Sequence, residues 1–175
     1  MTNKGIDLSS YIRSIPDWPK PGILFRDITP LLADAKAFAA AIDALCSSFA
    51  DASVEYVAAV EARGFIFGSA VAEQLGAGFV PIRKKGKLPY ATESVTYELE
   101  YGSDTLEVHR DAARPGAEVL MVDDLLATGG TMAAACELIG KIGGHVAGIT
   151  FLIELSELQG RSKLAGYKIN TVISY

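Results

Sequence analysis

Residues 119–132 read VLMVDDLLATGGTM and contain the clearest structural signal in this chain. The four apolar residues Val119–Val122 predict a buried strand, and Asp123 and Asp124 follow at its carboxyl end. A TGGT turn then leads into an apolar-periodic helix that begins at Met132. Because ionised Asp is rarely buried without a partner, the two carboxylates are candidate ligand-binding groups rather than packing residues.

The TGGT turn has the features of a phosphate-binding site. Its adjacent glycines, Gly129 and Gly130, allow a tight turn and a close approach of the backbone to a ligand. The N-terminus of the following helix offers unpaired N–H groups and the positive end of the helix dipole, and both favour a bound phosphate. Since the two carboxylates can bind hydroxyl groups, the whole stretch predicts a sugar-phosphate site.

Two alternative interpretations of this stretch have less support. An apolar strand followed by Asp-Asp also occurs in P-loop nucleotidases, but their G-x-x-x-x-G-K-[ST] motif is absent from this sequence. The Gly-Lys pairs at residues 86–87 and 140–141 are followed by Leu and Ile, and no G-x-G-x-x-G motif opens a helix. A purely structural strand–turn–helix remains the other alternative, although it would not require two Asp and two Thr around the glycines.

Composition indicates a single globular domain. The chain has 175 residues, half of them apolar, which is enough for one domain with a sizeable core over residues 1–175. Its net charge of −5 argues against non-specific nucleic-acid binding. No apolar run approaches the length of a membrane span and residues 1–8 contain no signal core, so a cytoplasmic protein without a membrane partner is expected.

The cysteines and histidines do not indicate a metal site of their own. Cys46 and Cys136 lie among Ala and Leu in helical patterns, so both are predicted to be small core residues. His109 and His145 have no Cys or His at metal-ligand spacing, and no protein-based metal site is predicted.

Helical and strand patterns alternate along the rest of the chain. Apolar runs predict strands at residues 56–60, 78–82, 118–122, 146–154 and 168–174. Helical periodicity predicts helices at residues 7–15, 35–50, 65–75 and 132–142, and prolines exclude regular structure at residues 16–22. Apolar residues alternate with polar ones on both sides of residues 102–104, and this pattern predicts an antiparallel hairpin with one solvated face. This order of strands and helices along the chain predicts an α/β fold, in which a mostly parallel twisted sheet is flanked by helices. In such a fold, ligands bind beyond the carboxyl ends of the strands.

Two further loops at this predicted sheet edge carry groups that bind anions. Residues 61–65 (EARGF) follow one strand and place an Arg between small residues at the start of a helix. Residues 83–87 (RKKGK) follow another strand and place four cations around a glycine in an otherwise acidic protein. A charge run is also typical of a solvated face, which remains the alternative. Together with the TGGT turn, the loops fit a ligand with a phosphate, a ribose and a further polyanionic group.

These stretches resemble the type I phosphoribosyltransferases, which bind 5-phosphoribosyl 1-pyrophosphate (PRPP), over nearly the entire chain. The DDLLATGGT run at residues 123–131 is typical of that family, and FRD at 25–27 with LEYG at 99–102 narrows the resemblance to its adenine-using branch. Further matching stretches are PGILFRDITPLL at 21–32, EARGF at 61–65, IRKKGKLP at 82–89 and YELEYG at 97–102. The resemblance implies the type I phosphoribosyltransferase fold, an N-terminal hood at residues 1–34, a flexible β-hairpin lid at residues 92–109, and transfer of phosphoribose to adenine.

The resemblance also implies roles for individual residues. Asp123 and Asp124 are expected to bind the ribose hydroxyls, and Phe25 and Arg26 to stack on adenine and read its edge. The remaining implied ligands bind phosphate groups: Ala127, Thr128, Gly129, Gly130 and Thr131 the 5′-phosphate, and Ala62, Arg63, Gly64, Arg83, Lys84 and Lys87 the pyrophosphate. In the family that the chain resembles, an acidic residue and a Ser often precede Arg-Gly-Phe, but this chain has Glu61-Ala62 at these positions. Only the backbone at Ala62 is therefore expected to contact pyrophosphate.

Glu100, near the tip of the implied lid, is the candidate for proton exchange with the base. A solvated carboxylate on an exposed hairpin is the alternative for this residue. The resemblance further implies Mg²⁺, held mainly by pyrophosphate and ribose oxygens, and a homodimer in which the cations of residues 83–87 reach across the interface.

Two other functions are compatible with a phosphoribosyl site. A sensor that regulates transcription would need a DNA-binding domain, and the sequence has neither a basic recognition helix nor spare length for one. A transferase that acts on hypoxanthine, xanthine or a pyrimidine would share most of these motifs, so the identity of the base rests on fewer residues.

Overall fold

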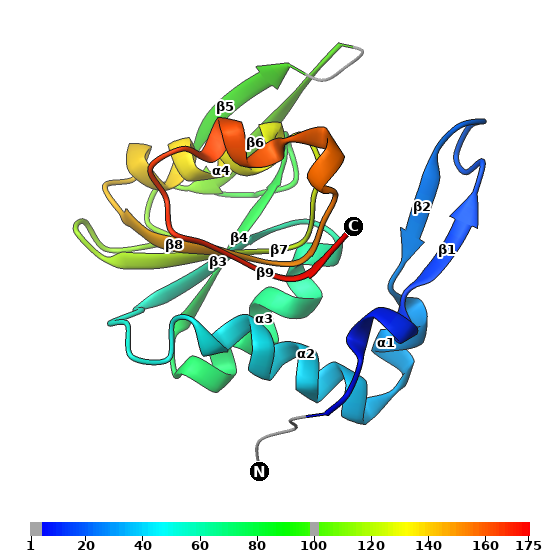
Figure 1. Ribbon diagram of the computed structural model, residues 1–175. Coiled ribbons are helices and arrows are strands. Elements are labelled where there is room, and N and C mark those ends of the chain that lie inside the picture. The colour runs from blue at the N-terminus through cyan, green and yellow to red at the C-terminus, as the bar shows by residue number, and fades with distance from the viewer. Residues whose placement is uncertain (1–4, 99–101) are drawn as a thin grey trace. The chain divides into compact units, whose positions relative to one another are not determined.

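The computed structural model describes residues 5–98 and 102–175, and the chain forms two compact units (Figure 1). The first unit ends at Ala44 and the second spans Leu45–Tyr175, with helix α2 (Ala35–Ser47) running across the boundary. Within the described ranges, no helix is long and apolar enough to cross a membrane. The organisation as one domain with a hood remains a prediction.

The N-terminal unit contains a two-stranded sheet where the sequence predicted a longer helix. The Asp7 carboxylate accepts a hydrogen bond from the backbone N–H of Ser9, but the helix that it caps is a single 3-10 segment, η1 (Leu8–Tyr11). Strand β1 (Arg13–Pro16) then pairs antiparallel with β2 (Leu24–Asp27). The helix prediction for residues 7–15 is therefore wrong beyond η1, because β2 provides strand partners for this part of the chain. Helix α1 (Thr29–Ala33) and α2 follow.

The second unit is built on a seven-stranded sheet with the order β5-β6-β4-β3-β7-β8-β9. The strands β4, β3, β7, β8 and β9 are parallel, whereas β6 and β5 are antiparallel additions at one edge. Helix α3 covers one face, and α4 covers the other together with η3 (Figure 1). This arrangement confirms the predicted α/β fold with a mostly parallel sheet.

The strands and helices of this unit lie close to their predicted positions. The strands are β3 (Tyr56–Val60), β4 (Gly78–Lys84), β5 (Thr92–Glu98), β6 (Ser103–His109), β7 (Glu118–Leu126), β8 (His145–Glu154) and β9 (Ile169–Ser174). The helices are α3 (Arg63–Leu75), α4 (Gly130–Lys141), η2 (Ser156–Leu158) and η3 (Gly160–Leu164). Both α helices begin two residues earlier than the apolar pattern predicted, because the small residues of the preceding loops form their first turns.

The core lies between the central strands and α4. Residues Val119–Val122 and the middle of β8 are fully buried, as expected for parallel strands that are covered on both faces. Leu138 and Ile139 of α4 pack into the same cluster. Cys46 and Cys136 are both buried, and burial raises the pKa of Cys136 to about 12. Their prediction as core residues is confirmed.

Strand β7 extends further than the sequence predicted. Its pairing with β3 ends at Val122, but its pairing with β8 continues to Leu126, opposite Glu154. Asp123 and Asp124 therefore lie inside β7, in the part that projects beyond the end of β3. The prediction that the strand ends at Val122 is wrong, because β8 provides a backbone partner that the local pattern does not reveal.

The antiparallel hairpin is confirmed and is joined to the main sheet. Strands β5 and β6 pair from Thr92 opposite His109 to Glu98 opposite Ser103. Strand β6 also pairs with the end of β4 at Arg83 and Lys84. Val95, Leu106 and Val108 are buried on one face of the hairpin. On the other face Ser94 and Thr96 are exposed, but Glu107 is buried and accepts a hydrogen bond from the Gly86 N–H.

Candidate active site

A cavity of about 270 Å³ opens where β3 and β7 end. It is lined by residues 60–63, which run from the end of β3 into α3, by residues 123–132, which run from the end of β7 into α4, and by Phe151 of β8. The structure thus brings together Ala62, Arg63, the Asp pair and all of residues 127–131. This position agrees with the rule that ligands of parallel α/β sheets bind at the carboxyl ends of the strands.

The segment Ala127–Thr131, here called the phosphate turn, combines a glycine bend with a free helix N-terminus. Gly129 has a φ of 79°, which only glycine adopts without strain, and α4 begins at the next residue. In the part of the chain described here, no side chain caps α4, and its first turn contains no acidic residue. Its first N–H groups are therefore available to an anion. Thr131 Oγ1 also lies 3.3 Å from the Tyr97 hydroxyl of the hairpin.

The two carboxylates are fixed by contacts within the cavity wall. Asp123 Oδ1 accepts a hydrogen bond of 2.9 Å from the backbone N–H of Asp124. A Cβ atom on Gly64 would lie 2.7 Å from that same oxygen, so Gly64 makes room for the carboxylate. Asp124 Oδ2 lies 2.9 Å from Arg63 Nε. The ion pair joins the start of α3 to β7.

Burial shifts the pKa of both carboxyls upward. Desolvation raises the pKa of Asp123 well above its usual range, and the charge of Asp124 adds to this effect. Desolvation also raises the pKa of Asp124, although the Arg63 guanidinium opposes the shift. Buried carboxylates of this kind bind hydroxyl groups strongly when ionised, since their charge is poorly screened by water.

The segment Arg83–Lys87, here called the basic loop, is paired with carboxylates. Arg83 Nη2 lies 3.1 Å from Glu61 Oε2, and the Lys84 backbone N–H donates to Glu61 Oε1 at 2.7 Å. The Lys84 ammonium lies 3.1 Å from Asp104 Oδ2. Burial alone would raise the pKa of Glu61, but the hydrogen bonds from the Lys84 N–H and from Arg83 outweigh burial, so the pKa of Glu61 is lowered. Glu61 lines the cavity, so it connects the basic loop to the site.

The predicted base-binding residues lie on β2 in the N-terminal unit. Arg26 Nη1 donates to Ser14 Oγ on β1 at 2.6 Å. The ring of Phe25 contacts the exposed ring of Trp18 edge-on, with centroids 4.4 Å apart. Trp18 was not among the predicted site residues. The predicted proton-transfer residue, Glu100, lies outside the described residues.

The oxygen atoms of the cavity are compatible with Mg²⁺ bound through a ligand. In the described ranges, no three His, Cys, Asp or Glu side chains are grouped so that they could hold a metal ion. Asp123 and Asp124 offer the hard oxygen ligands that Mg²⁺ prefers, and Mg²⁺ usually takes one or two carboxylates together with substrate phosphates.

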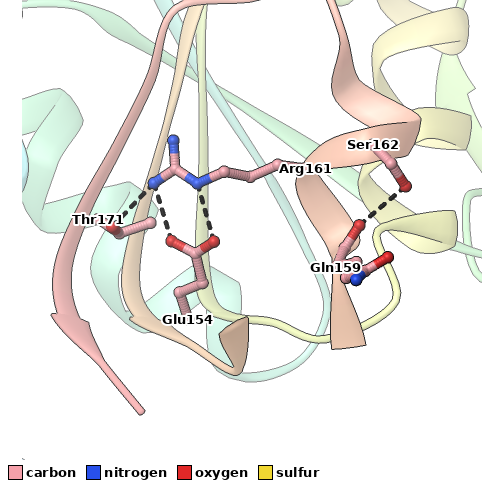
Figure 2. Close-up of polar contacts among 5 residues, drawn as sticks. All are labelled: Glu154, Gln159, Arg161, Ser162 and Thr171. Atoms are coloured by element: carbon pink, nitrogen blue, oxygen red, sulfur yellow. Dashed lines mark hydrogen bonds and ion pairs between the residues drawn. The ribbon is translucent and has the colours of Figure 1, made fainter. Parts of the chain in front are cut away.

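The sequence did not identify the segment behind the phosphate turn. Glu154 at the end of β8 and Arg161 of η3 form a bidentate ion pair there (Figure 2). Because Glu154 ends a parallel strand, the carboxyl-edge rule that identified the other loops also applies to it. The pairing of Glu154 with Arg161 could not be recognised from the spacing of the two residues in the sequence alone.

Comparisons with known proteins agree with this geometry. Residues 27–172 match the model of the phosphoribosyl transferase domain, and the chain belongs to this family. Within it, the chain is similar to the adenine phosphoribosyltransferase of Desulfitobacterium hafniense, with 55% identity over 98% of this chain and 99% of that protein. The corresponding enzyme of Thermotoga neapolitana is 54% identical over 97% of this chain and 100% of that protein.

Solved structures of adenine phosphoribosyltransferases share the fold. The enzyme from Thermoanaerobacter pseudethanolicus superimposes with a TM-score of 0.93 at 53% identity, covering 96% of this chain and 98% of that one. The Saccharomyces cerevisiae enzyme, in complex with an imino-altritol bisphosphate and adenine, gives a TM-score of 0.89 at 40% identity, covering 94% and 96%.

Proposed function

We propose that this chain transfers the 5-phosphoribosyl group of PRPP to adenine, which yields AMP and pyrophosphate. The observation that carries the proposal is the cavity in which the phosphate turn, the half-buried Asp123, the buried Asp124 and the start of α3 converge. Close relatives at more than half identity over almost their whole length are adenine phosphoribosyltransferases, which supports adenine as the base. The reaction belongs to purine salvage, and we expect it in the cytoplasm.

The phosphate turn would hold the 5′-phosphate through the N–H groups at the start of α4. Thr128 and Thr131 add hydroxyl donors, and Gly129 and Gly130 allow the backbone to approach the phosphate closely. Asp123 and Asp124 would accept hydrogen bonds from the ribose hydroxyls, which orients the anomeric carbon. In this role Arg63 has to share Asp124 with the sugar or move to the pyrophosphate.

The start of α3 and the basic loop would hold the leaving pyrophosphate. The bond between the anomeric carbon and the pyrophosphate oxygen breaks while the bond to the base nitrogen forms, so negative charge collects on the leaving group. The Arg63 guanidinium and the backbone amides of residues 62–64 would stabilise that charge most in the transition state. Mg²⁺ bound to the pyrophosphate would supply further charge neutralisation. Arg83, Lys84 and Lys87 would assist, across a homodimer interface.

The base would lose a proton as its nitrogen bonds to the sugar. Glu100 is proposed to accept this proton, and the hairpin at residues 92–109 to exclude water as a lid. Phe25 and Arg26 are proposed to hold adenine. Glu100→Leu and Glu100→Gln should both lower turnover by about a hundredfold or more, because neither side chain can exchange a proton. Near-normal turnover of the Gln variant would restrict Glu100 to orienting the base.

A panel of free bases tests the proposed function directly. The protein is incubated with PRPP, Mg²⁺ and adenine, hypoxanthine, guanine, xanthine, uracil or orotate, and pyrophosphate release is measured. Rapid release with adenine alone supports the proposal, whereas preference for another base assigns a different transferase. Binding of PRPP without turnover on any base would indicate a sensor instead.

A further inference from the structure

The segment Leu155–Leu164, here called the bracing segment, packs directly behind the phosphate turn. Gly160 is buried, and a Cβ atom on it would overlap the carbonyl oxygen of Ala127 and lie 3.1 Å from the Gly129 nitrogen. A Cβ atom on Gly129 would overlap the Gly160 carbonyl oxygen in turn. The two backbones are thus in contact with no side chain between them, so the position of Gly160 limits the positions that the turn can take.

The guanidinium of Arg161 anchors the middle of the bracing segment to the sheet. Arg161 Nε and Nη2 donate to the two carboxylate oxygens of Glu154, each at 2.8 Å (Figure 2). Arg161 Nη2 also donates to Thr171 Oγ1 on β9 at 3.0 Å. The paired guanidinium lowers the pKa of Glu154, which keeps the carboxylate ionised near neutrality.

Glu154 is itself tied to the start of the phosphate turn. It lies opposite Leu126 in the pairing of β8 with β7, and the next residue, Leu155, donates its backbone N–H to the Leu126 carbonyl at 2.9 Å. Glu154 is buried, with 7% of its surface exposed. The anchor of the bracing segment and the entry of the phosphate turn therefore share one rigid piece of sheet.

Local contacts fix the two ends of η3. Ser162 Oγ donates to the Gln159 carbonyl at 2.8 Å, and Gln159 itself has a φ of 50° (Figure 2). At the other end, Leu164 is buried in the main core cluster. Arg161 lies between these points, and its side chain is the polar tie that connects this part of the segment to β8 and β9.

We propose that Arg161 and Glu154 are positioning residues that hold Gly160 against the phosphate turn and so set its affinity for the 5′-phosphate. Neither side chain lines the cavity, and Arg161 acts on the ligand only through the backbone of residues 127–129. This inference rests on the proposed function, because it assigns the phosphate turn to the 5′-phosphate of PRPP and AMP.

Two variants, Arg161→Gln and Thr171→Val, test the proposal by weakening the anchor to different degrees. Arg161→Gln should raise the KM for PRPP and the Kd for AMP by roughly tenfold, as expected for a coupling through packed backbone. The KM for adenine should stay within about twofold, because adenine does not use the phosphate turn. Thr171→Val removes one of the three anchoring hydrogen bonds and should change the same two constants in the same direction, by less.

Arg114→Gln is the matched control. Arg114 also pairs with a carboxylate, Glu55, but that residue directly precedes β3 and so lies at the opposite edge of the sheet. This variant should lose a similar ion pair without a change in the KM for PRPP.

The outcomes separate this inference from the proposed function. If the wild-type protein does not bind AMP or use PRPP, the proposed function fails and this inference fails with it. If the wild type binds AMP and Arg161→Gln binds it equally well, with only a lower Tm, the ion pair is purely structural and the positioning role is wrong. Should Arg161→Gln not fold, an unchanged Kd for AMP in Thr171→Val would overturn the proposal.

Discussion

The phosphate turn and the basic loop are both anion-binding candidates, but they are built in opposite ways. The phosphate turn contains no charged residue and offers backbone N–H groups, held by Gly129 and by the contact with Gly160. The basic loop contains four cations, yet Arg83 and Lys84 are already paired with Glu61 and Asp104. The phosphate turn is ready to bind an anion, whereas Arg83 and Lys84 of the basic loop have to leave their carboxylate partners first.

The contrast explains where binding free energy should come from. Donors fixed by the fold need no rearrangement when the ligand arrives, which makes them effective per hydrogen bond. A cation that leaves an existing carboxylate gains only the difference between two ion pairs. The sequence indicated the same order of importance, because residues 119–132 contain its clearest signal, whereas a charge run such as residues 83–87 is also typical of a solvated face.

Gly129→Ala should have the largest effect. The new Cβ atom would be strained at a φ of 79° and would overlap the Gly160 carbonyl. We expect kcat/KM for PRPP to fall by about a hundredfold or more, since small misplacements of binding groups can cost this much. Gly86→Ala in the basic loop is the matched variant, with a φ of 78° and no described atom within 4 Å of the new Cβ.

Gly86→Ala carries the backbone strain alone, which costs about 1–3 kcal/mol, and should mainly lower the Tm. Equal losses of kcat/KM in the two variants would show that the contact with Gly160 is irrelevant and that the two regions do not differ as described. Steady-state kinetics and thermal unfolding of both proteins provide the comparison.

The sequence predicted the phosphate turn well because all of its determinants lie within residues 119–132. The apolar run, the carboxylates and the glycines are neighbours in the chain, so a local pattern identifies them. The same is true of the central strands, whose continuous apolar runs reflect burial on both faces. The extension of β7 through Asp123 and Asp124 was missed, since it depends on pairing with β8.

The pairings of the basic loop could not be predicted. Glu61 and Arg83 are 22 residues apart and meet only because β3 and β4 are neighbours in the sheet. Arg161 and Glu154 are closer in sequence, but their contact depends on the path of η2 and η3. In both cases the sequence shows each charged residue but not its partner. For the basic loop an anion-binding run of cations was therefore expected, where the structure pairs Arg83 and Lys84 with carboxylates.

Asp123→Asn, next to the phosphate turn in the cavity wall, should separate activity from stability. The pKa of Asp123 is raised by burial, so the folded protein binds more protons than the unfolded chain between the usual 3.8 and the raised value. Stability contributed by this group therefore falls as the pH rises through that window, and the ionised form destabilises the fold at neutral pH.

At neutral pH, Asp123→Asn should leave the Tm unchanged or higher, because Asn can still accept from the Asp124 N–H. It should lower kcat/KM for PRPP by about tenfold to a hundredfold, since a hydrogen bond to a charged group contributes about 1.5–3 kcal/mol. A lower Tm with normal kinetics would make Asp123 a structural residue. Asp124→Asn is the comparison variant, which also leaves Arg63 without this partner.

Glu61→Gln tests whether the ion pair between Glu61 and Arg83 weakens the binding of PRPP to the basic loop. Gln keeps an oxygen that can accept from the Lys84 N–H, but it removes the charge that pairs with Arg83. If PRPP has to compete with Glu61, the variant should have a lower KM for PRPP, by up to about fivefold, as expected for a pair at the surface. A KM several times higher would instead mean that Glu61 is required to position Arg83.

Lys84→Ala should have the smallest effect, and its dependence on salt should distinguish charge from backbone geometry. The side chain of Lys84 is 60% exposed and paired with Asp104, so its removal should raise the KM for PRPP by no more than about twofold to fivefold. Because screening shortens the reach of exposed charges, the difference from wild type should be largest at low ionic strength and vanish near 1 M salt. The defect of Gly129→Ala should persist at every salt concentration, since it arises from steric displacement of the phosphate turn. A Lys84→Ala defect that is large and independent of salt would place Lys84 in direct, desolvated contact with the substrate and would remove the distinction between the two regions.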